Sequence, residues 1–303
     1  VTVQIYDHAS EALFDKIFDR LREIEEKMTI NKEDSEVLKV NKNAGIDFVK
    51  VSEDTFHVIQ KGKIFSELSR GRFDISIGPL VKLWNIGTEE ARVPSQEEID
   101  QKKQLIDYRD VLLNESEKSV MLKRKGMILD LGGIAKGFAA DEIVKIFKEN
   151  HVERGLINVG GNVFAYGSRP DGADWKIGIR NPFSSEQDYI GIVSVSDKTV
   201  VTSGVYERYF EEGGKRYHHI LDPETGYPVE NNLVSVTIVG ERSIDADALS
   251  TAVFSLGLEE GMKFIQETEN TEAIWITKDN QVYVSPGLFQ HFELTHPQFT
   301  LVK

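Results

Sequence analysis

The sequence contains no cysteine and no apolar run long enough to cross a membrane. The absence of cysteine excludes disulfides, zinc–thiolate sites and cysteine nucleophiles. Basic residues are also scarce, because 36 Lys and Arg stand against 50 Asp and Glu and leave a formal net charge of -14. Phosphate backbones bind to basic stripes, so this charge argues against a nucleic acid as the partner. A chain this acidic that handles a phosphorylated ligand needs local Lys or Arg residues, or a divalent cation.

The chain has neither a Pro/Gly/Ser-rich linker nor a low-complexity tract, which favours compact packing throughout its 303 residues. This length exceeds what one small core requires, so one large domain and two closely packed lobes are both compatible with it. The chain begins with Val1, not with Met, and shows no signal peptide. We therefore expect a mature or trimmed form of a longer precursor.

Helical periodicity predicts one helix around residues 9–27 and a second near residues 53–69. Ser95, followed three residues later by Glu98, forms a capping-box pattern for a short charged helix that ends at about Ile106. The apolar faces of the two longer helices are expected to enter the core. These faces consist of Leu13, Ile17, Leu21 and Ile24 in the first helix and of Phe56, Ile59, Ile64 and Leu68 in the second.

Short strand-like runs recur along the chain, and helical segments after Gly137 and after Ile244 are interleaved with them. The order of strands and helices has no strict βαβ rhythm. We therefore predict an α+β fold with a largely antiparallel sheet. The strand-like runs are TVQIYD, DVLLN, SVMLK, GLINVGGNVFAYG, WKIGI, GIVSVS, TVVTS and VSVTIVG.

The segment LDLGGIAKGFAAD, residues 129–141, places an acid, glycines and a lysine at the start of a helix. It matches neither a Walker A loop nor a dinucleotide-binding G-x-G-x-x-G pattern. Backbone N–H groups at a glycine turn and at a helix N-terminus attract anions, and Lys136 adds a positive charge. Asp130 is a candidate contact for a ribose hydroxyl or a base edge. The alternative is a helix start whose glycines serve packing alone.

The segment SIDADALSTAVFSLG, residues 243–257, places Asp247 and Thr251 four positions apart on one helix face. A carboxylate and a hydroxyl at this spacing offer two hard oxygens to a magnesium ion, and Ser250 lies close enough to contribute a third. The alternative is structural, with Asp245 or Asp247 capping the helix and Thr251 bonding back to its own turn.

Two further segments carry candidate ligand contacts. The first, KRYHHILDPETGYPV, is expected to leave a hairpin and enter a tight turn, where only one of His218 and His219 can point into a given site. A rigid loop of this kind can present an imidazole as a base or a phosphate contact, although a lone histidine is more often structural. The second, FDISIGPLVKLWNIG, reads as too broken for a simple helix or strand, and its Trp84 suits either a flat heterocycle or the core.

Six segments, taken in order, resemble the ApbE family of flavin transferases, the FAD:protein FMN transferases. They cover roughly residues 2–285 and read FDISIGPLVKLW, LDLGGIAKGFAAD, NVGGNVFAYG, TSGVYERYF, HHILDPETGYPV and ADALSTAVF. The resemblance implies a single ApbE-like domain over residues 1–303, with a mixed, largely antiparallel sheet and flanking helices. It also implies an enzyme that binds FAD with Mg²⁺, breaks the pyrophosphate, attaches FMN through a phosphoester to a Thr or Ser of an acceptor protein, and releases AMP.

The resemblance also implies roles for individual residues. Asp247 and Thr251, with Ser250, would ligate Mg²⁺ through side-chain oxygens, and the backbone carbonyl of Gly133 would complete the protein's share. Asp247 would therefore serve catalysis through the metal, not as the base. His219 would activate the incoming hydroxyl or steady the phosphates. The residues implied to contact FAD are Asn31, Arg72, Phe73, Asp74, Asp130, Lys136 and Leu221.

Asn31 departs from the family pattern, because many members carry Tyr or another aromatic there, a ring able to stack on the nucleotide. Trp84 or Tyr206 is a candidate to replace that ring. Without one, water would compete with the acceptor hydroxyl, and the chain would be a Mg²⁺-dependent FAD pyrophosphatase that yields FMN and AMP. A reading from another class is a non-catalytic flavin-binding protein.

The resemblance implies a bacterial protein that is exported and often lipid-anchored at the outer face of the cytoplasmic membrane. Any contact with the membrane would go through an anchor that this chain does not contain. The expected partners are FAD and an acceptor protein with a Thr or Ser flavinylation motif, and no nucleic acid.

Overall fold

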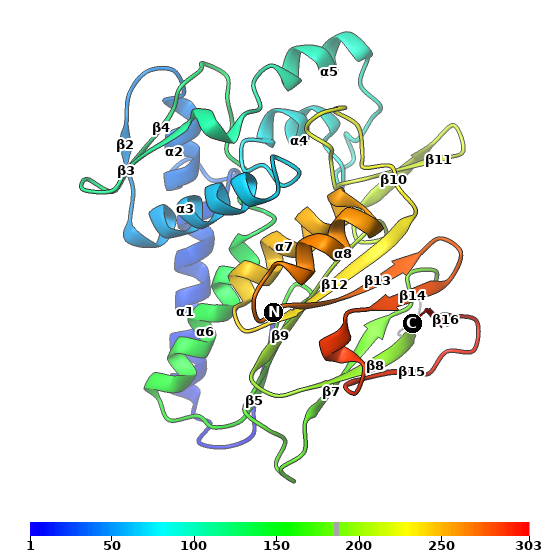
Figure 1. Cartoon of the computed structure of the whole chain (residues 1–303). Helices are drawn as coiled ribbons and strands as arrows, with labels where there is room; N and C mark the ends of the chain where they lie inside the picture. Colours follow the sequence, from blue (N-terminus) through cyan, green and yellow to red (C-terminus); the bar gives the residue numbers. More distant parts are fainter. Residues whose placement is uncertain (185–187, 303) are drawn as a thin grey trace. The chain divides into compact units, whose positions relative to one another are not determined.

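The computed structural model describes residues 1–184 and 188–302 (Figure 1). The chain forms two compact units. Unit 1 comprises Val1–Arg20, Lys136–Tyr206 and Asn231–Lys303, and unit 2 comprises Leu21–Ala135 and Glu207–Glu230. The division falls inside the first helix, α1, which spans Glu11–Met28. No helix among the described residues has both the length and the apolar character needed to cross a membrane.

Unit 1 is built on an eight-stranded sheet with the strand order β1-β5-β6-β9-β12-β13-β14-β16. Its strands are Thr2–Ile5 (β1), Gly155–Val159 (β5), Asn162–Tyr166 (β6), Lys198–Gly204 (β9), Leu233–Gly240 (β12), Glu272–Thr277 (β13), Gln281–Val284 (β14) and Thr300–Val302 (β16). A three-stranded sheet, β15-β8-β7, is formed by Trp175–Arg180 (β7), Tyr189–Val195 (β8) and Phe292–Leu294 (β15). Among the described residues only the β14–β16 ladder of these sheets is parallel, so the predicted largely antiparallel sheet is confirmed.

Three further helices of unit 1 follow its strands, namely α6 (Ala135–Glu149), α7 (Ser243–Leu256) and α8 (Leu258–Gln266), with a short 3-10 turn at Pro286–Leu288. Helix α7 packs on β9 and β12, and α8 packs on α7 and β13, as the orange helices beside the yellow strand β12 in Figure 1 show. Buried side chains of both sheets form one apolar cluster, which includes Trp175, Ile179, Val193, Val234, Ile274 and Ile276. This core fixes the strands on which α7 rests.

Unit 2 consists of short helices and two small sheets. The helices are α2 (Glu36–Lys42), α3 (Glu53–Leu68), α4 (Gly78–Trp84) and α5 (Gln96–Lys103), with a 3-10 turn at Tyr108–Asp110. The sheets are β2-β4-β3, from Val49–Lys50 (β2), Val111–Asn114 (β3) and Ser119–Leu122 (β4), and the hairpin of Tyr209–Glu212 (β10) and Lys215–His218 (β11). Leu80, Trp84, Ile99 and Leu221 are buried together and form a core for this part of the chain.

Two local predictions about unit 2 are wrong. Ile64 and Leu68 of α3 are 44% and 55% exposed, although the periodicity placed them in the core. The packed face of α3 instead includes Gly62, where an added Cβ would lie 2.5 Å from Ile75 Cγ2. The segment after Phe73 is also less broken than predicted, because α4 forms there with Pro79 in its first turn, where the missing N–H costs nothing.

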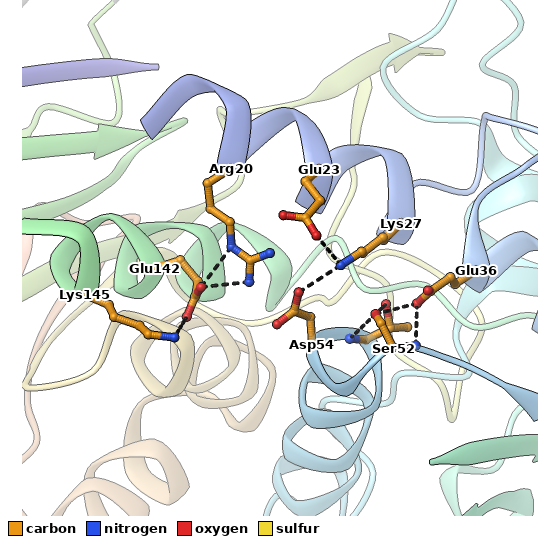
Figure 2. A network of polar contacts seen from close by, with 9 residues as sticks. Arg20, Glu23, Lys27, Glu36, Ser52, Asp54, Glu142 and Lys145 are labelled. Atoms are coloured by element: carbon orange, nitrogen blue, oxygen red, sulfur yellow. Dashed lines mark hydrogen bonds and ion pairs between the residues drawn. The ribbon is translucent and has the colours of Figure 1, made fainter. Parts of the chain in front are cut away.

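Polar contacts tie α1 to its neighbours within each unit (Figure 2). In unit 1, Arg20 Nη2 lies 2.7 Å from Glu142 Oε2 of α6, with both side chains largely buried. In unit 2, Lys27 Nζ lies 3.1 Å from Asp54 Oδ2 at the start of α3. Ser52, the N-cap of α3, donates its N–H and its hydroxyl to one Glu36 oxygen, at 3.0 and 2.8 Å. These bonds hold the helices together within each unit.

Helices α6 and α7 approach each other closely at Gly137. A Cβ at this position would lie 2.2 Å from the carbonyl oxygen of Ser243 and 2.6 Å from Cα of Ile244. Both distances are far inside van der Waals contact, so no residue other than glycine fits without moving the backbone of α7. The glycine that follows Lys136 is therefore required by helix packing.

Each of these two helices caps the N-terminus of the other. Asp141 of α6 accepts from the N–H groups of Ser243, at 2.8 Å, and Ile244, at 3.0 Å. Asp247 of α7 accepts from the N–H of Gly137 at 2.9 Å. The first N–H groups of a helix have no partner inside it, so two carboxylates satisfy donors that the helices themselves leave open. Asp247 therefore caps α6 and not its own helix, and Asp141 supplies the acceptors for the first N–H groups of α7.

We expect Gly137→Ala to destabilise the protein. Helix propensity alone favours alanine by about 1 kcal/mol, whereas overpacking costs about 1–3 kcal/mol or more. The clash with the Ser243 carbonyl should win, and urea unfolding followed by circular dichroism measures the sign. Lys148→Ala, an exposed change on the same helix, is the control and should stay within about 0.5 kcal/mol of the parent chain. A Gly137→Ala protein more stable than the parent would contradict the close approach.

Asp141 should make stability depend on pH. Burial raises the pKa of Asp141 to about 6, and the hydrogen bonds from Ile244 and Ser243 oppose this only in part. An unfolded Asp titrates near pH ~3.9, so between about pH 4 and about pH 6 the folded chain binds more protons than the unfolded chain. The stability that protonated Asp141 contributes is therefore lost as the pH rises through that window.

Asp141→Asn removes this titration while keeping one acceptor oxygen for the α7 cap. Relative to the parent chain, the variant should gain stability between about pH 4 and about pH 7, by at most about 3 kcal/mol. Urea unfolding of both proteins across this range measures the difference. Asp15→Asn, at an exposed position of α1, serves as the control with a flat difference. Parallel pH profiles for the parent chain and Asp141→Asn would show that Asp141 titrates as an ordinary carboxyl.

Candidate functional site

The candidate residues of unit 1 are centred on Asp247, whose side chain is almost fully buried in the second turn of α7. Its Oδ1 lies 3.0 Å from Lys136 Nζ, and its Oδ2 accepts from the Gly137 N–H. The structure thus brings together the lysine of one predicted motif and the aspartate of another. The ammonium and the helix N-terminus together hold this carboxylate in one direction.

Three hydroxyl groups are linked to one another near the backbone of Asp247. Ser250 donates to the Asp247 carbonyl oxygen at 2.8 Å, and its Oγ lies 2.8 Å from Ser203 Oγ. The Ser203 Oγ also lies 3.3 Å from Thr251 Oγ1. Ser203, in β9, was not among the predicted site residues. Its contact follows from the packing of α7 on β9, which no local pattern in the sequence reports.

The oxygens of Asp247, Ser250 and Thr251 are the hard donors that Mg²⁺ accepts. Within residues 1–184 and 188–302, no group of three or more His, Cys, Asp or Glu side chains is arranged to hold a metal ion. The predicted set needs no such group, because it contains one carboxylate and otherwise uses hydroxyl and carbonyl oxygens. The chemistry of the donors in unit 1 therefore fits a magnesium ion at Asp247. Gly133 belongs to unit 2, and its carbonyl as a ligand stays a prediction.

A tight turn between β5 and β6 lies against the Lys136 side chain. An added Cβ at Gly160 would lie 3.4 Å from Lys136 Cδ. Gly160 and Gly161 both have left-handed backbones, with φ of 57° and 98°, as a two-residue hairpin of the mirror-image type requires. Next to them the buried Asn162 Nδ2 has no hydrogen-bond partner among the described residues. The segment NVGGNV thus packs against the side chain of Lys136.

In unit 2, the turn that precedes α6 is held by Asp130 of the turn itself and by Asn41 of α2. Asp130 Oδ1 accepts from the Gly132 N–H at 2.7 Å. Asn41 holds the preceding residue at both polar groups, because its amide donates to the Leu129 carbonyl and accepts from the Leu129 N–H, at 3.2 and 2.7 Å. The roles of Asp130 and Gly133 toward a ligand stay predictions.

Phe73 and Asp74 are buried, which limits how they can meet a ligand. Asp74 Oδ1 accepts from the N–H and hydroxyl of Ser76, both at 2.7 Å, and its Oδ2 accepts from the Tyr108 N–H at 3.1 Å. Burial raises the pKa of Asp74, and these hydrogen bonds oppose the rise. Asp74 therefore acts as a turn cap, and a contact between FAD and this stretch would have to use mainly the backbone. Arg72 is 37% exposed, with Nη1 3.4 Å from Asp222 Oδ2.

The candidate base His219 follows directly after β11. Its ring Nδ1 lies 3.2 Å from the Arg208 carbonyl oxygen, and its backbone N–H donates to the same oxygen at 3.1 Å. A carbonyl only accepts, so Nδ1 carries the proton in this bond. In the neutral ring Nε2 then has the basic lone pair, as a general base requires.

The turn after His219 rests on the core of unit 2. Leu221 is buried against Trp84 and pairs with Pro228. Trp84 is fully buried and donates from Nε1 to the Gly226 carbonyl at 2.8 Å. Leu221 is thus a core residue, and any contact it makes with FAD would leave its side chain largely in place. The Trp84 ring cannot replace a missing stacking ring, so that suggestion is wrong.

Asn31 lies exposed in the loop between α1 and α2, and its N–H donates to Thr29 Oγ1 at 3.2 Å. Tyr206, the other suggested replacement for an aromatic ring, lies in unit 1 with the Arg180 guanidinium 5.1 Å from its ring centre. Its ring is half-buried and already stacked with a cation. Neither observation assigns a stacking ring to the nucleotide.

Comparison with known proteins gives consistent matches. The model of the ApbE family matches residues 1–275. The FAD:protein FMN transferase of Klebsiella pneumoniae is 41% identical over 285 residues, covering 94% of this chain and 88% of that protein. The protein of the same name from Treponema pallidum is 38% identical over 303 residues, covering 96% of this chain and 84% of that protein.

Solved structures agree with the fold. The ApbE protein of Thermotoga maritima superposes with a TM-score of 0.87 at 33% identity, covering 95% of both chains. The flavin transferase ApbE from Vibrio cholerae superposes with a TM-score of 0.83 at 29% identity, covering 95% of this chain and 92% of that one. These matches confirm the predicted fold.

Proposed function

The chain belongs to the ApbE family, and on this premise we propose that it is an FAD:protein FMN transferase. The enzyme moves the FMN half of FAD onto a Thr or Ser hydroxyl of an acceptor protein and releases AMP. The relatives that carry this name match nearly the whole chain. The structural observation that carries the proposal is the bond from His219 Nδ1 to the Arg208 carbonyl, which leaves Nε2 as the base that an acceptor hydroxyl needs.

The reaction exchanges one phosphorus–oxygen bond for another. The acceptor oxygen bonds to the FMN phosphorus, and the bond from that phosphorus to the bridging oxygen of the pyrophosphate breaks. The bridging oxygen leaves with AMP, and the hydroxyl proton passes to His219 Nε2 and then to water. No oxidation or reduction takes place, and no co-reactant besides FAD and the acceptor is needed.

Unit 1 contributes charge to this reaction. Asp247 and Thr251, with Ser250, would hold Mg²⁺, which when bound offsets the negative charge that develops on phosphate oxygens. Lys136 brings an ammonium to within 3.0 Å of Asp247 Oδ1, and the same ammonium is suited to a phosphate oxygen. Lys136 and the bound Mg²⁺ would supply local positive charge in a chain whose formal net charge is -14.

The deciding assay combines the protein, FAD and Mg²⁺ with a candidate acceptor that bears a Thr-containing flavinylation site. Mass spectrometry of the acceptor and chromatography of the flavins are read together. An acceptor heavier by one FMN less water, with AMP released, supports the transferase. Free FMN and AMP beside an unmodified acceptor would replace it with the pyrophosphatase, for which the exposed Asn31 is the reason to look. If FAD stays intact in the presence of a known acceptor, the protein would be a non-catalytic flavin-binding protein.

Asp247→Asn should abolish turnover and weaken Mg²⁺ binding, because an amide carries no charge to hold the cation. Calorimetric titration of Mg²⁺ in the presence of FAD measures the affinity, and the transfer assay measures turnover. Asp245→Asn, on the same helix, is the matched control and should behave as the parent chain. Near-normal product formation by Asp247→Asn in EDTA-washed, Mg²⁺-replenished buffer would refute the metal assignment.

His219→Asn should keep FAD binding and slow the chemical step by about 10²–10⁴-fold. The asparagine amide can still donate to the Arg208 carbonyl near the position of Nδ1, but it offers no base at the position of Nε2. Single-turnover transfer rates and an FAD-binding titration separate the two effects. Transfer at the parental rate would mean that the base lies elsewhere.

A further inference from the structure

The two adjacent histidines of the segment HHILDP have opposite ring protonation. The His218 ring is buried, and its Nδ1 accepts from the Ile220 N–H at 3.3 Å. Its Nε2 lies 3.0 Å from the Val229 carbonyl oxygen, which can only accept. His218 therefore carries its proton on Nε2, whereas His219 carries its proton on Nδ1.

The His218 ring occupies a place that a backbone hydrogen bond normally fills. Ile220 and Val229 face each other across the turn, and the Val229 N–H donates to the Ile220 carbonyl at 2.9 Å. A hydrogen-bonded antiparallel pair usually exchanges a second bond, here from the Ile220 N–H to the Val229 carbonyl. In this chain the imidazole spans those two groups, accepting from one and donating to the other. The ring is a spacer inserted into the ladder.

This spacer fixes the backbone on the C-terminal side of His219. The peptide group between His219 and Ile220 is bound through its N–H to the His218 ring. The N-terminal side of His219 is bound through its own N–H to the Arg208 carbonyl, the same oxygen that receives Nδ1. Both peptide groups that flank His219 are therefore fixed by hydrogen bonds. With this backbone, the His219 ring can point in only one direction if its Nδ1 is to donate to the Arg208 carbonyl.

We propose that His218 is a positioning residue that sets the tautomer and direction of the base His219. It does so by spanning Ile220 and Val229 with a neutral ring, and it touches neither FAD nor the acceptor hydroxyl. This inference rests on the proposed function, because it assigns His218 a role through the base of that reaction. The role is specific to a ring that both accepts and donates, which distinguishes it from the filling of space.

Three variants separate the two bonds from the volume of the ring. His218→Phe keeps a planar ring and removes both bonds. His218→Gln places an amide donor near the position of Nε2 and so keeps the bond to the Val229 carbonyl. His218→Asn places an oxygen near the position of Nδ1 and so keeps the bond from Ile220. His291→Asn, at an exposed position of unit 1, is the matched control.

The direct readout is the ¹⁵N chemical shifts of the imidazole nitrogens in histidine-labelled protein. The parent chain should show the Nε2–H form for His218 and the Nδ1–H form for His219. In His218→Phe the His219 ring should become a mixture of both forms, and the transfer kcat should fall about tenfold or more. The two single-bond variants should lie between His218→Phe and the parent chain in both readouts, and they keep the test valid if the phenylalanine variant does not fold.

The outcomes separate this inference from the proposed function. A single Nδ1–H form of His219 and an unchanged kcat in all three variants, even with a lower Tm, would reduce His218 to a structural residue and overturn the inference. A His219 tautomer that depends on His218, in a protein that transfers no FMN to a proven acceptor, would overturn the proposed function and leave only the conformational half of the inference. Coupled changes in tautomer and kcat, with unchanged Mg²⁺ affinity, support both.

Discussion

The contact of Gly137 with the first turn of α7 is the constraint on which unit 1 depends. Gly137 has no Cβ, and a Cβ there would clash with the Ser243 carbonyl. The two helix N-termini can therefore come close enough for each to be capped by a carboxylate of the other helix. Asp247 is buried as a result, and it meets Lys136 at hydrogen-bond distance. A wider separation of the helices would leave two rows of unpaired N–H groups and a buried carboxylate without its donors, which folded proteins rarely tolerate.

The same arrangement explains how an acidic chain can act on a dinucleotide. Net charge acts over long range and is screened by salt, whereas the lysine beside the buried Asp247 acts over a few ångströms. The fold places the Lys136 ammonium at Asp247, and this local charge does not need a basic surface. The overall charge that argues against a nucleic-acid partner therefore does not weaken the case for a phosphorylated substrate.

Sequence patterns predicted elements well where one local rule decides the outcome. The capping box at Ser95 and the antiparallel runs are of this kind. The patterns failed where a contact between residues far apart in the sequence decides which face of a helix is buried. Ile64 is exposed because α3 packs through the face that contains Gly62, which lies against Ile75. Asp141 caps α7, and it is the last residue of the segment LDLGGIAKGFAAD. This role could not be predicted, because the N–H groups that it accepts from belong to a helix about a hundred residues further along the chain. The tautomers of His218 and His219 could not be predicted, since both are set by backbone carbonyls whose positions depend on how the hairpin and its following turn are paired.

Reciprocal capping also has a consequence for motion. The N–H groups of Gly137, Ser243 and Ile244 are held by side chains of the opposite helix, so fraying of either helix removes an acceptor from the other. Helix ends usually exchange their amide protons early through local opening, independently of one another. We therefore expect the starts of α6 and α7 to open together, so that their amide protons exchange with solvent in one event. The backbone amides around Asp247 would then be protected from hydrogen exchange as amides in the protein interior are, although they lie at helix ends.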